Sequence, residues 1–552
     1  MLFSFSFNNR REAVNENGLR RFNSNFKVIL RQKTLAILLF AFLSLALTIF
    51  IISCDSETSP VIFVPTGSPD LTTAEVETLI AHAVELAERI GATVAVAVVD
   101  REANVLGVLR MNGINQGATQ VYHPETGAIA KARTAAFLSS NQHAFTTLTA
   151  CFITRPHFPP GINNTPGGPL YGVPYSSLGG GDIQPNGPDS CGTTLLGAPG
   201  LTGVPGGVPI FKSGRLAGGI GISGGALDFT LDLCQGSSED ESIALGALAA
   251  LSPPDDLRGD RIFIDGIRFL YANTDAPAGN FTFSFADALT LGVVDTCFVI
   301  RATPDSSFPI EGEVDLSANY GASFDFSITA GSILTQADVQ LIIDQAAEQA
   351  AKTRAAIRRP LGTPAQVFIS VVDTNGVVLG IWRTPDATLF SFDVSAQKAR
   401  TVVAFSRTDH PLGTQIRNIL GLNANQELAV SCRAVGFLSQ DFYPPGIDLE
   451  TLDKPVVPGP LYQGPEFTLQ RGLGLQPFGN GITIFPGAVP LYKNGVLAGG
   501  IGVSGDGVDQ DDIIAFTGAV GFEPPAGIRC DNFFYDEIHL PYVKFPRRAE
   551  ID

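Results

Sequence analysis

Histidine and lysine recur with the same spacing in two distant parts of the chain. His143 lies twelve residues after Lys131, and His410 lies twelve residues after Lys398. A histidine at this position could contact iron or a bound ligand, because imidazole is a common iron ligand. It could equally cap the C-terminal end of a helix, where imidazolium meets the helix dipole. Both interpretations stay open.

Paired cations accompany these histidines. Arg110 and Arg383 recur at matching positions, as do Lys131 and Lys398. Arginine binds carboxylates through two parallel hydrogen bonds, so these residues are candidates for holding a ligand carboxylate. The alternative is ordinary ion pairing at the surface of an acidic protein.

Aspartates and glycines suggest two other kinds of site. Asp509, Asp511 and Asp512 are candidates for a divalent cation, since hard cations favour carboxylate oxygen. N-capping of a helix explains them better, because the first half keeps only Asp240 with Glu239 and Glu241. The glycines of residues 219–224 and 500–505 match a dinucleotide motif. A preceding hairpin and the following acids argue against a bound pyrophosphate.

The sequence segments that must position these residues occur twice in the chain. Residues 206–224 and 487–505 are identical at 13 of 19 positions, which indicates an internal duplication. Lys493-Asn494-Gly495 predicts a type I′ hairpin turn, and Lys212-Ser213-Gly214 is its counterpart. The glycines that follow lie within the returning strand. They admit either a closely packed helix or a flat ligand.

The flanking segments complete an α+β domain in each half. Thr72 with Glu75, and Thr335 with Asp338, predict capping boxes that open amphipathic helices. Strands, a hairpin, a second helix and a long loop rich in Pro and Gly then precede the repeated block. We expect two tandem domains, each an antiparallel sheet with packed helices, forming a pseudo-dimer within one chain. The predicted boundaries are 71–272 for copy 1, 273–333 for a β-rich insertion or linker, and 334–552 for copy 2.

Each copy resembles the GlcG/HbpS family of haem-binding domains, which also forms the C-terminal domain of PduO-type proteins. The resemblance rests on Val98-Val99-Asp100 and Val371-Val372-Asp373, on Lys131–Thr134 and Lys398–Thr401, and on the strand ending in GGIGxSG. Copy 1 departs after Gly224, where about ten extra residues contain Cys234. The resemblance implies binding of haem or a related tetrapyrrole, often in an oligomer. It favours a carrier, sensor or accessory protein over an enzyme. A haem- or metal-assisted redox or degradative enzyme and a non-binding scaffold remain alternatives.

The N-terminal segment predicts export. Residues 1–53 contain a basic stretch and the uncharged, mostly apolar run Leu35–Ile52, followed by Ser53-Cys54. This order resembles a bacterial lipobox, with Cys54 as the lipidated residue and residues 54–70 as a tether. A transmembrane anchor is the alternative. Either interpretation places the rest of the chain at the membrane, facing the periplasm or the exterior.

Cysteine content and charge agree with an exported protein that does not bind nucleic acid. Six cysteines remain after Cys54, enough for up to three disulfides. The net charge of −18 disfavours contact with a phosphate backbone.

Overall fold

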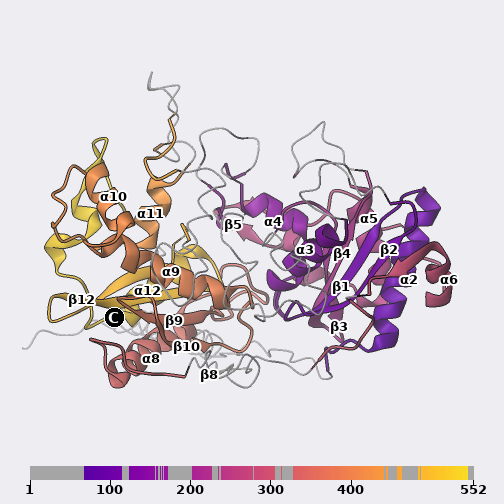
Figure 1. The fold of residues 1–552 in the computed structure, drawn as a ribbon, viewed down its shortest axis with the longest axis horizontal. Helices are drawn as coiled ribbons and strands as arrows, with labels where there is room; N and C mark the ends of the chain where they lie inside the picture. The colour runs from indigo at the N-terminus through magenta and orange to yellow at the C-terminus, as the bar shows by residue number, and fades with distance from the viewer. Residues whose placement is uncertain are drawn as a thin grey trace, which may run out of the picture. The chain divides into compact units, whose positions relative to one another are not determined.

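The computed structural model describes most of the chain after residue 67 (Figure 1). The described residues are 68–114, 124–155, 202–226, 238–304, 327–440 and 486–544 almost throughout, with shorter pieces at 157–171, 234–236, 312–313, 443–444, 457–462 and 483–484. The predicted signal and Cys54 lie outside them. In the part of the chain that is described, no helix combines the length and the apolarity needed to span a bilayer.

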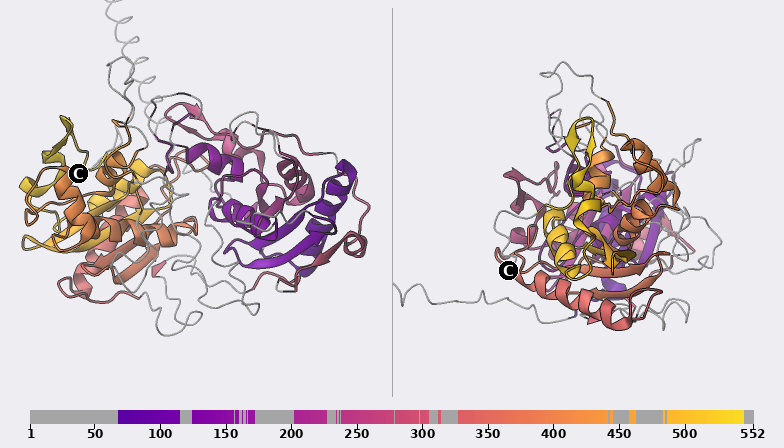
Figure 2. Two further views of the ribbon diagram at one scale, coloured as in Figure 1. Left: turned by 45° about the horizontal axis from the view of Figure 1, so that its top comes forward. Right: turned by 90° about the vertical axis from the view of Figure 1, so that its left-hand side faces the viewer.

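Copy 1 is a five-stranded antiparallel sheet with helices on both faces (Figures 1 and 2). Its strands, in spatial order, are β3 (Gly207–Lys212), β4 (Arg215–Ser223), β1 (Ala95–Asp100), β2 (Val105–Met111) and β7 (Gly292–Val294). The central strand β1 is buried on both faces, and its side chains alternate between two cores. One face packs α2 (Thr73–Ile90) and α5 (Glu239–Leu248), and the other packs α3 (Pro124–Phe137).

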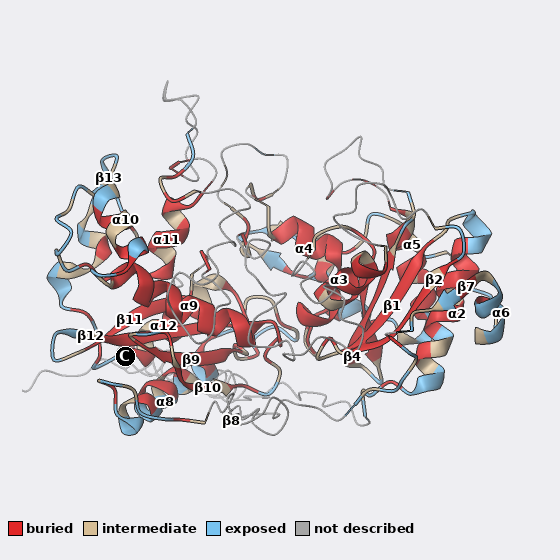
Figure 3. Cartoon of the chain, viewed as in Figure 1, coloured by how far each residue is buried: buried red, intermediate tan, exposed pale blue. Residues whose placement is uncertain are grey.

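Copy 2 repeats this sheet and its helices. The strand order is β11 (Ala488–Lys493), β12 (Val496–Ser504), β9 (Phe368–Asp373), β10 (Val378–Arg383) and β8 (Gly312–Glu313). The helices α8 (Gln336–Lys352) and α12 (Val508–Gly518) pack together, and α9 (Ser391–Ser406) packs on β12 and β9. Figure 3 shows α9 and the central strands as buried throughout. The predicted α+β class with two tandem antiparallel domains is confirmed.

Shorter elements complete both copies. They are the helices α4 (Thr147–Ile153), α6 (Phe285–Leu291), α10 (Pro411–Ile419) and α11 (Cys432–Leu438), the hairpins β5 (Phe263–Ile264) with β6 (Ile267–Arg268) and β13 (Phe534–Tyr535) with β14 (Ile538–His539), and 3₁₀ turns at Ala249–Leu251, Asp255–Leu257, Gly259–Arg261, Ala526–Ile528 and Cys530–Asn532. The segment 273–333, expected as a β-rich linker, also contains the helix α6. It supplies an edge strand to each sheet, β7 to copy 1 and β8 to copy 2.

The predicted turn and helix caps are present in both copies. Asn494 and Gly495 have φ angles of 53° and 79°, and Ser213 and Gly214 have 53° and 74°, the positive values that a type I′ turn requires. The capping boxes of Thr72 and Thr335 are formed. The lysine before each turn also reaches the capping acid, since Lys212 pairs with Glu75 at 2.8 Å and Lys493 pairs with Asp338 at 2.5 Å.

The strand glycines of the repeated block admit a helix and not a ligand. A Cβ on Gly221 would collide with the carbonyl oxygen of Ala128 in α3, and one on Gly502 would collide with that of Ser395 in α9. Gly219 and Gly500 meet the same helices. The close approach of helix to sheet therefore explains why the block is kept in both copies.

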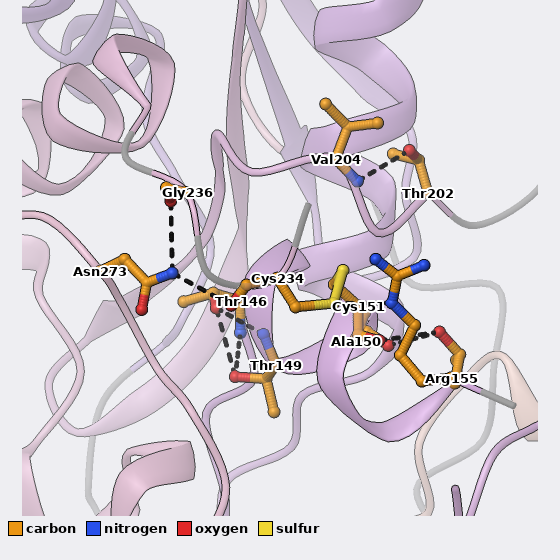
Figure 4. Close-up of a disulfide and its surroundings, with 11 residues drawn as sticks. Thr146, Thr149, Ala150, Cys151, Arg155, Thr202, Val204, Cys234, Gly236 and Asn273 are labelled. Carbon is orange, nitrogen blue, oxygen red and sulfur yellow. Dashed lines mark hydrogen bonds between the residues drawn. A yellow bond between two sulfur atoms is a disulfide. The ribbon is translucent and has the colours of Figure 1, made fainter. Parts of the chain in front are cut away.

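One disulfide distinguishes copy 1. Cys151 in α4 is bonded to Cys234, with 5.7 Å between the Cα atoms (Figure 4). The bridge ties the extra residues of copy 1 to α4. In copy 2, Cys432 and Cys530 are free and buried, and burial raises the pKa of both thiols. Cys191 and Cys297 lie outside the described residues.

Replacement of Gly221 or Gly502 by alanine is expected to destabilise the fold, because the new methyl group must push the helix off the sheet. Overpacking of this kind costs about 1–3 kcal/mol. The measurement is the shift of the thermal unfolding midpoint. Gly527→Ala is the control, since a Cβ there meets nothing within 4 Å. An equal shift in all three variants would contradict the packing role of the block.

Candidate ligand-binding cleft

The two paired lysines are engaged inside the fold. Lys131 reaches from α3 to Asp240 in α5 at 2.6 Å, and Lys398 reaches from α9 to Asp511 in α12 at 2.8 Å. Each ammonium group also donates to a carbonyl of the returning strand, to Ile222 at 2.8 Å and to Val503 at 2.7 Å. These residues therefore join the helices on the two faces of each sheet, a role different from the ligand recognition predicted for the lysines.

Burial dominates the electrostatics of these pairs. Burial raises the pKa of Asp511 to about 6, although Lys398 counteracts it. Burial likewise raises the pKa of Asp240 against the opposing effect of Lys131. A buried carboxylate that lost its lysine would be left uncompensated, so each pair is needed as a unit.

His143 is fully buried with both ring nitrogens hydrogen-bonded. Its Nε2 donates to the carbonyl of Leu138 just after α3, at 2.9 Å, so Nδ1 accepts from the Ser140 hydroxyl at 2.9 Å. Burial and the positive charge of Arg358 hold the pKa of His143 well below its ordinary value. The ring is thus a neutral imidazole that satisfies a carbonyl at a helix end.

His410 has a different local role, despite its equivalent spacing. It is the N-cap of α10, and its Nδ1 accepts from the backbone N–H of Leu412 at 3.3 Å. It therefore begins a helix, whereas His143 lies at the end of one. Iron ligation by either histidine stays a prediction.

The two predicted arginines also differ. Arg110 is partly exposed, and its Nε lies 3.4 Å from Glu125. Arg383 is buried against the ring of Phe368, and it donates to the carbonyls of Thr384, Pro385 and Ala387. Burial, aided by Arg101, lowers the pKa of Arg383 to about 10. The structure does not bring these arginines to the cleft described below.

The aspartates proposed for a cation are paired with basic residues. Arg433 bonds to both Asp509 and Asp512, and Lys544 pairs with Asp509 at 2.8 Å. Asp511 belongs to the buried pair with Lys398. Within the described ranges, no group of three or more His, Cys, Asp or Glu is arranged to hold a metal ion.

A large cleft lies between the two copies and was not anticipated from the motifs. Its volume is about 1450 Å³, larger than a typical small-ligand pocket. Copy 1 contributes Phe158 and the hairpin residues Phe263–Asp265, and copy 2 contributes α8, α12 and the segment after α8. Five basic residues line it, in a protein of net charge −18: Lys352, Arg354, Arg359, Arg433 and Lys544.

The segment after α8 is an insertion that only copy 2 carries. Val94 follows Val76 by 18 positions, whereas Val367 follows Val339 by 28. This difference in spacing was the available sequence signal for the cleft. The insertion closes on itself through Ala355 N–H to Thr363 O at 2.9 Å and Ala365 N–H to Thr353 O at 2.8 Å.

Arg358 anchors the insertion to both copies. The side chain is fully buried and bonds to Asp506 at 3.0 Å and to Asp386 at 3.1 Å within copy 2. It also donates to the Ser140 hydroxyl of copy 1 at 2.9 Å, the same hydroxyl that contacts His143. One guanidinium group therefore fixes the cleft wall relative to the end of α3.

A small cavity adjoins this cleft. It is lined by His143, Phe145 and Phe390 among others. Pro169, Ile264 and Gly507 line both this cavity and the cleft. With a volume of about 20 Å³ it holds no more than a water-sized group. His143 therefore lies behind the cleft wall.

Comparison with known proteins confirms the predicted family resemblance for both copies. A family model described as "Haem degrading protein HbpS-like" matches residues 71–229 and 334–519, which together exceed half of the chain. The corrinoid adenosyltransferase PduO of Citrobacter freundii is 30% identical over 165 residues, and that of Salmonella typhimurium is 29% identical over the same length. The match covers 30% of this chain and about a third of the length of each relative, 35% and 34%.

Several solved structures are also similar. A PduOC:heme complex is 25% identical, with 35% of this chain and 96% of that chain covered and a TM-score of 0.22. Klebsiella pneumoniae protein ORFY is 21% identical, with 34% and 90% covered and a TM-score of 0.22. HbpS is 26% identical, with 34% and 94% covered and a TM-score of 0.18.

Breaking one buried ion pair is expected to destabilise its copy strongly. Lys398→Met leaves Asp511 buried without its cationic partner, which costs about 3–5 kcal/mol. The double variant Lys398→Met with Asp511→Leu removes both charges and should recover much of that loss. Thermal unfolding of the single and double variants measures the coupling. Purely additive losses would show that the pair does not act as a unit.

Proposed function

Because the chain belongs to the HbpS-like family, we propose that it binds haem or a closely related tetrapyrrole in the cleft between its two copies. The cleft is the observation that carries this proposal. It combines a volume of about 1450 Å³ with large apolar side chains left open to solvent, since Phe263 is 55% exposed and Leu361 is 61% exposed. Exposed apolar groups gathered in a concave site are typical of ligand binding.

The cleft residues fit the macrocycle and its carboxylates. Phe263, Ile264, Leu361 and Val520 provide apolar contact for a flat ring system, and the basic residues provide partners for anionic groups. No His, Cys, Met or Tyr is present among the described lining residues. His143 would have to release its hydrogen bonds before it could contact iron. A bound haem would supply redox-active iron. The role that we propose for the protein is that of a carrier, sensor or accessory protein that holds this haem.

Haem titration of the whole protein tests this proposal. We expect a saturable Soret band, with affinity lowered about tenfold or more by Val520→Trp, because the indole occupies part of the surface that would contact the ring system. Val496→Trp is the matched control, since Val496 is an exposed valine outside the cleft lining. Absence of saturable binding would refute the function. Equal weakening by both substitutions would refute the location.

The same spectra test the histidine prediction. A folded variant with His143→Ala and His410→Ala that loses the Soret band would assign iron ligation to this pair. An unchanged spectrum would show that neither histidine ligates the iron.

Haem degradation is the second candidate, and the description of the matching family favours it. Degradation oxidises the macrocycle, so the titration is repeated with added hydrogen peroxide as the oxidant. Degradation would then appear as a loss of the Soret band with time, faster than that of free haem under the same conditions. A stable band would support binding alone.

We also propose that the protein is exported and tethered to the membrane through Cys54. The disulfide Cys151–Cys234 supports this proposal, because such bridges persist in oxidising compartments. Cys54→Ser is expected to move the protein from the membrane fraction to the soluble fraction. Unchanged membrane association of this variant would favour the transmembrane anchor instead.

A further inference from the structure

The two copies present the same helix face to different surroundings. On α8, the residues Gln345, Glu348, Gln349 and Lys352 line the cleft. The equivalent positions on α2, counted from the two capping boxes, are His82, Glu85, Leu86 and Arg89.

In copy 1 this face is covered by the segment that follows the domain. The ring of Phe281 stacks on His82 with 3.6 Å between centroids. Glu85 accepts hydrogen bonds from the backbone N–H groups of Thr282 and Phe283, each at 2.8 Å. Arg89 donates to the carbonyl of Asn280 at 2.5 Å.

These contacts hold the covering segment firmly. Burial alone would raise the pKa of Glu85, but the hydrogen bonds from Phe283, Thr282 and Arg89 outweigh it and lower the pKa to about 2. Glu85 is therefore a carboxylate at neutral pH, with four donors around it. The chain itself occupies the face of copy 1 that would otherwise match the cleft.

In copy 2 the equivalent face is open and is flanked by two arginines of the insertion. The other cleft cations have acidic partners, since Lys352 pairs with Glu348, and Arg433 and Lys544 pair with Asp509. No carboxylate among the described residues pairs with Arg354 or Arg359. The Arg359 guanidinium instead donates to the carbonyl of Arg261 in copy 1. The remaining acid of the lining, Asp265, comes from copy 1.

We infer that the chain holds one flat aromatic dicarboxylate per chain, on the α8 face of copy 2, and that Arg354 and Arg359 bind its carboxylates. This inference deepens the proposed function and rests on it. The apolar lining of the cleft contacts the ring system. The insertion supplies charge at one edge, where a guanidinium can bind a carboxylate through two hydrogen bonds. Recognition through carboxylates is independent of iron.

Fluorescence titration of the whole protein with metal-free protoporphyrin IX and with its dimethyl ester tests the inference. We expect one protoporphyrin per chain and an ester affinity lower by about tenfold or more, because the ester carries no charge. The double variant Arg354→Ala with Arg359→Ala should bind acid and ester equally. Arg101→Ala with Arg215→Ala is the control, as it removes two positive charges outside the cleft lining.

The outcomes separate the inference from the proposed function. Haem binding at two sites per chain, or equal binding of acid and ester by the native protein, would overturn the inference and leave the function standing. Greater weakening by the control pair than by the insertion pair would also overturn it. Absence of binding of both haem and porphyrin would refute the proposed function itself. Circular dichroism of each variant establishes that the fold is kept.

Discussion

The buried contact between a lysine and an aspartate is the constraint on which each copy depends. The lysine comes from the helix on one face of the sheet, the aspartate comes from the helix on the other, and a strand carbonyl lies between them. Gly206 and Gly487 lie directly against the lysine ammonium groups, and a Cβ on either residue would contact the lysine Nζ. The glycines of the returning strand then let the lysine-bearing helix lie close enough for this reach. The repeated block, the lysine helix and the acid after the block therefore form one unit.

Outside this unit the copies diverge freely. Copy 1 adds residues after the block and secures them with a disulfide, and its α2 face is covered by the following segment. Copy 2 adds residues between α8 and β9, and Arg358 of this segment donates a hydrogen bond to Ser140 of copy 1. Neither addition disturbs the ion pair or the hairpin. The same buried ion pair and hairpin are therefore compatible with different added segments at the surfaces of the two copies.

Local features could be predicted from the sequence, and long-range partners could not. The type I′ turns and the capping boxes depend on neighbours in the chain, so their residue types were sufficient. The strand glycines indicated a close approach but left open whether a helix or a ligand makes it, because the helices they contact are distant in the sequence. Asp511, the partner of Lys398, lies 113 residues away, and a local sequence pattern cannot identify a partner at that distance. The spacing of His143 and His410 was real, but adjacent residues gave the two rings different hydrogen bonds. The unequal spacing before β1 and β9 marks the insertion, but it does not show that the insertion reaches the other copy.

Fusion of two copies has an evolutionary consequence for the insertion at residues 353–366. In a homodimer of a single domain, any inserted segment appears in both subunits and must be compatible with the interface at both places. Here each copy is encoded separately, so ten residues could be added to one face while the other was closed by its own chain. Duplication therefore gave selection access to an asymmetric interface that a symmetric dimer cannot reach by single mutations.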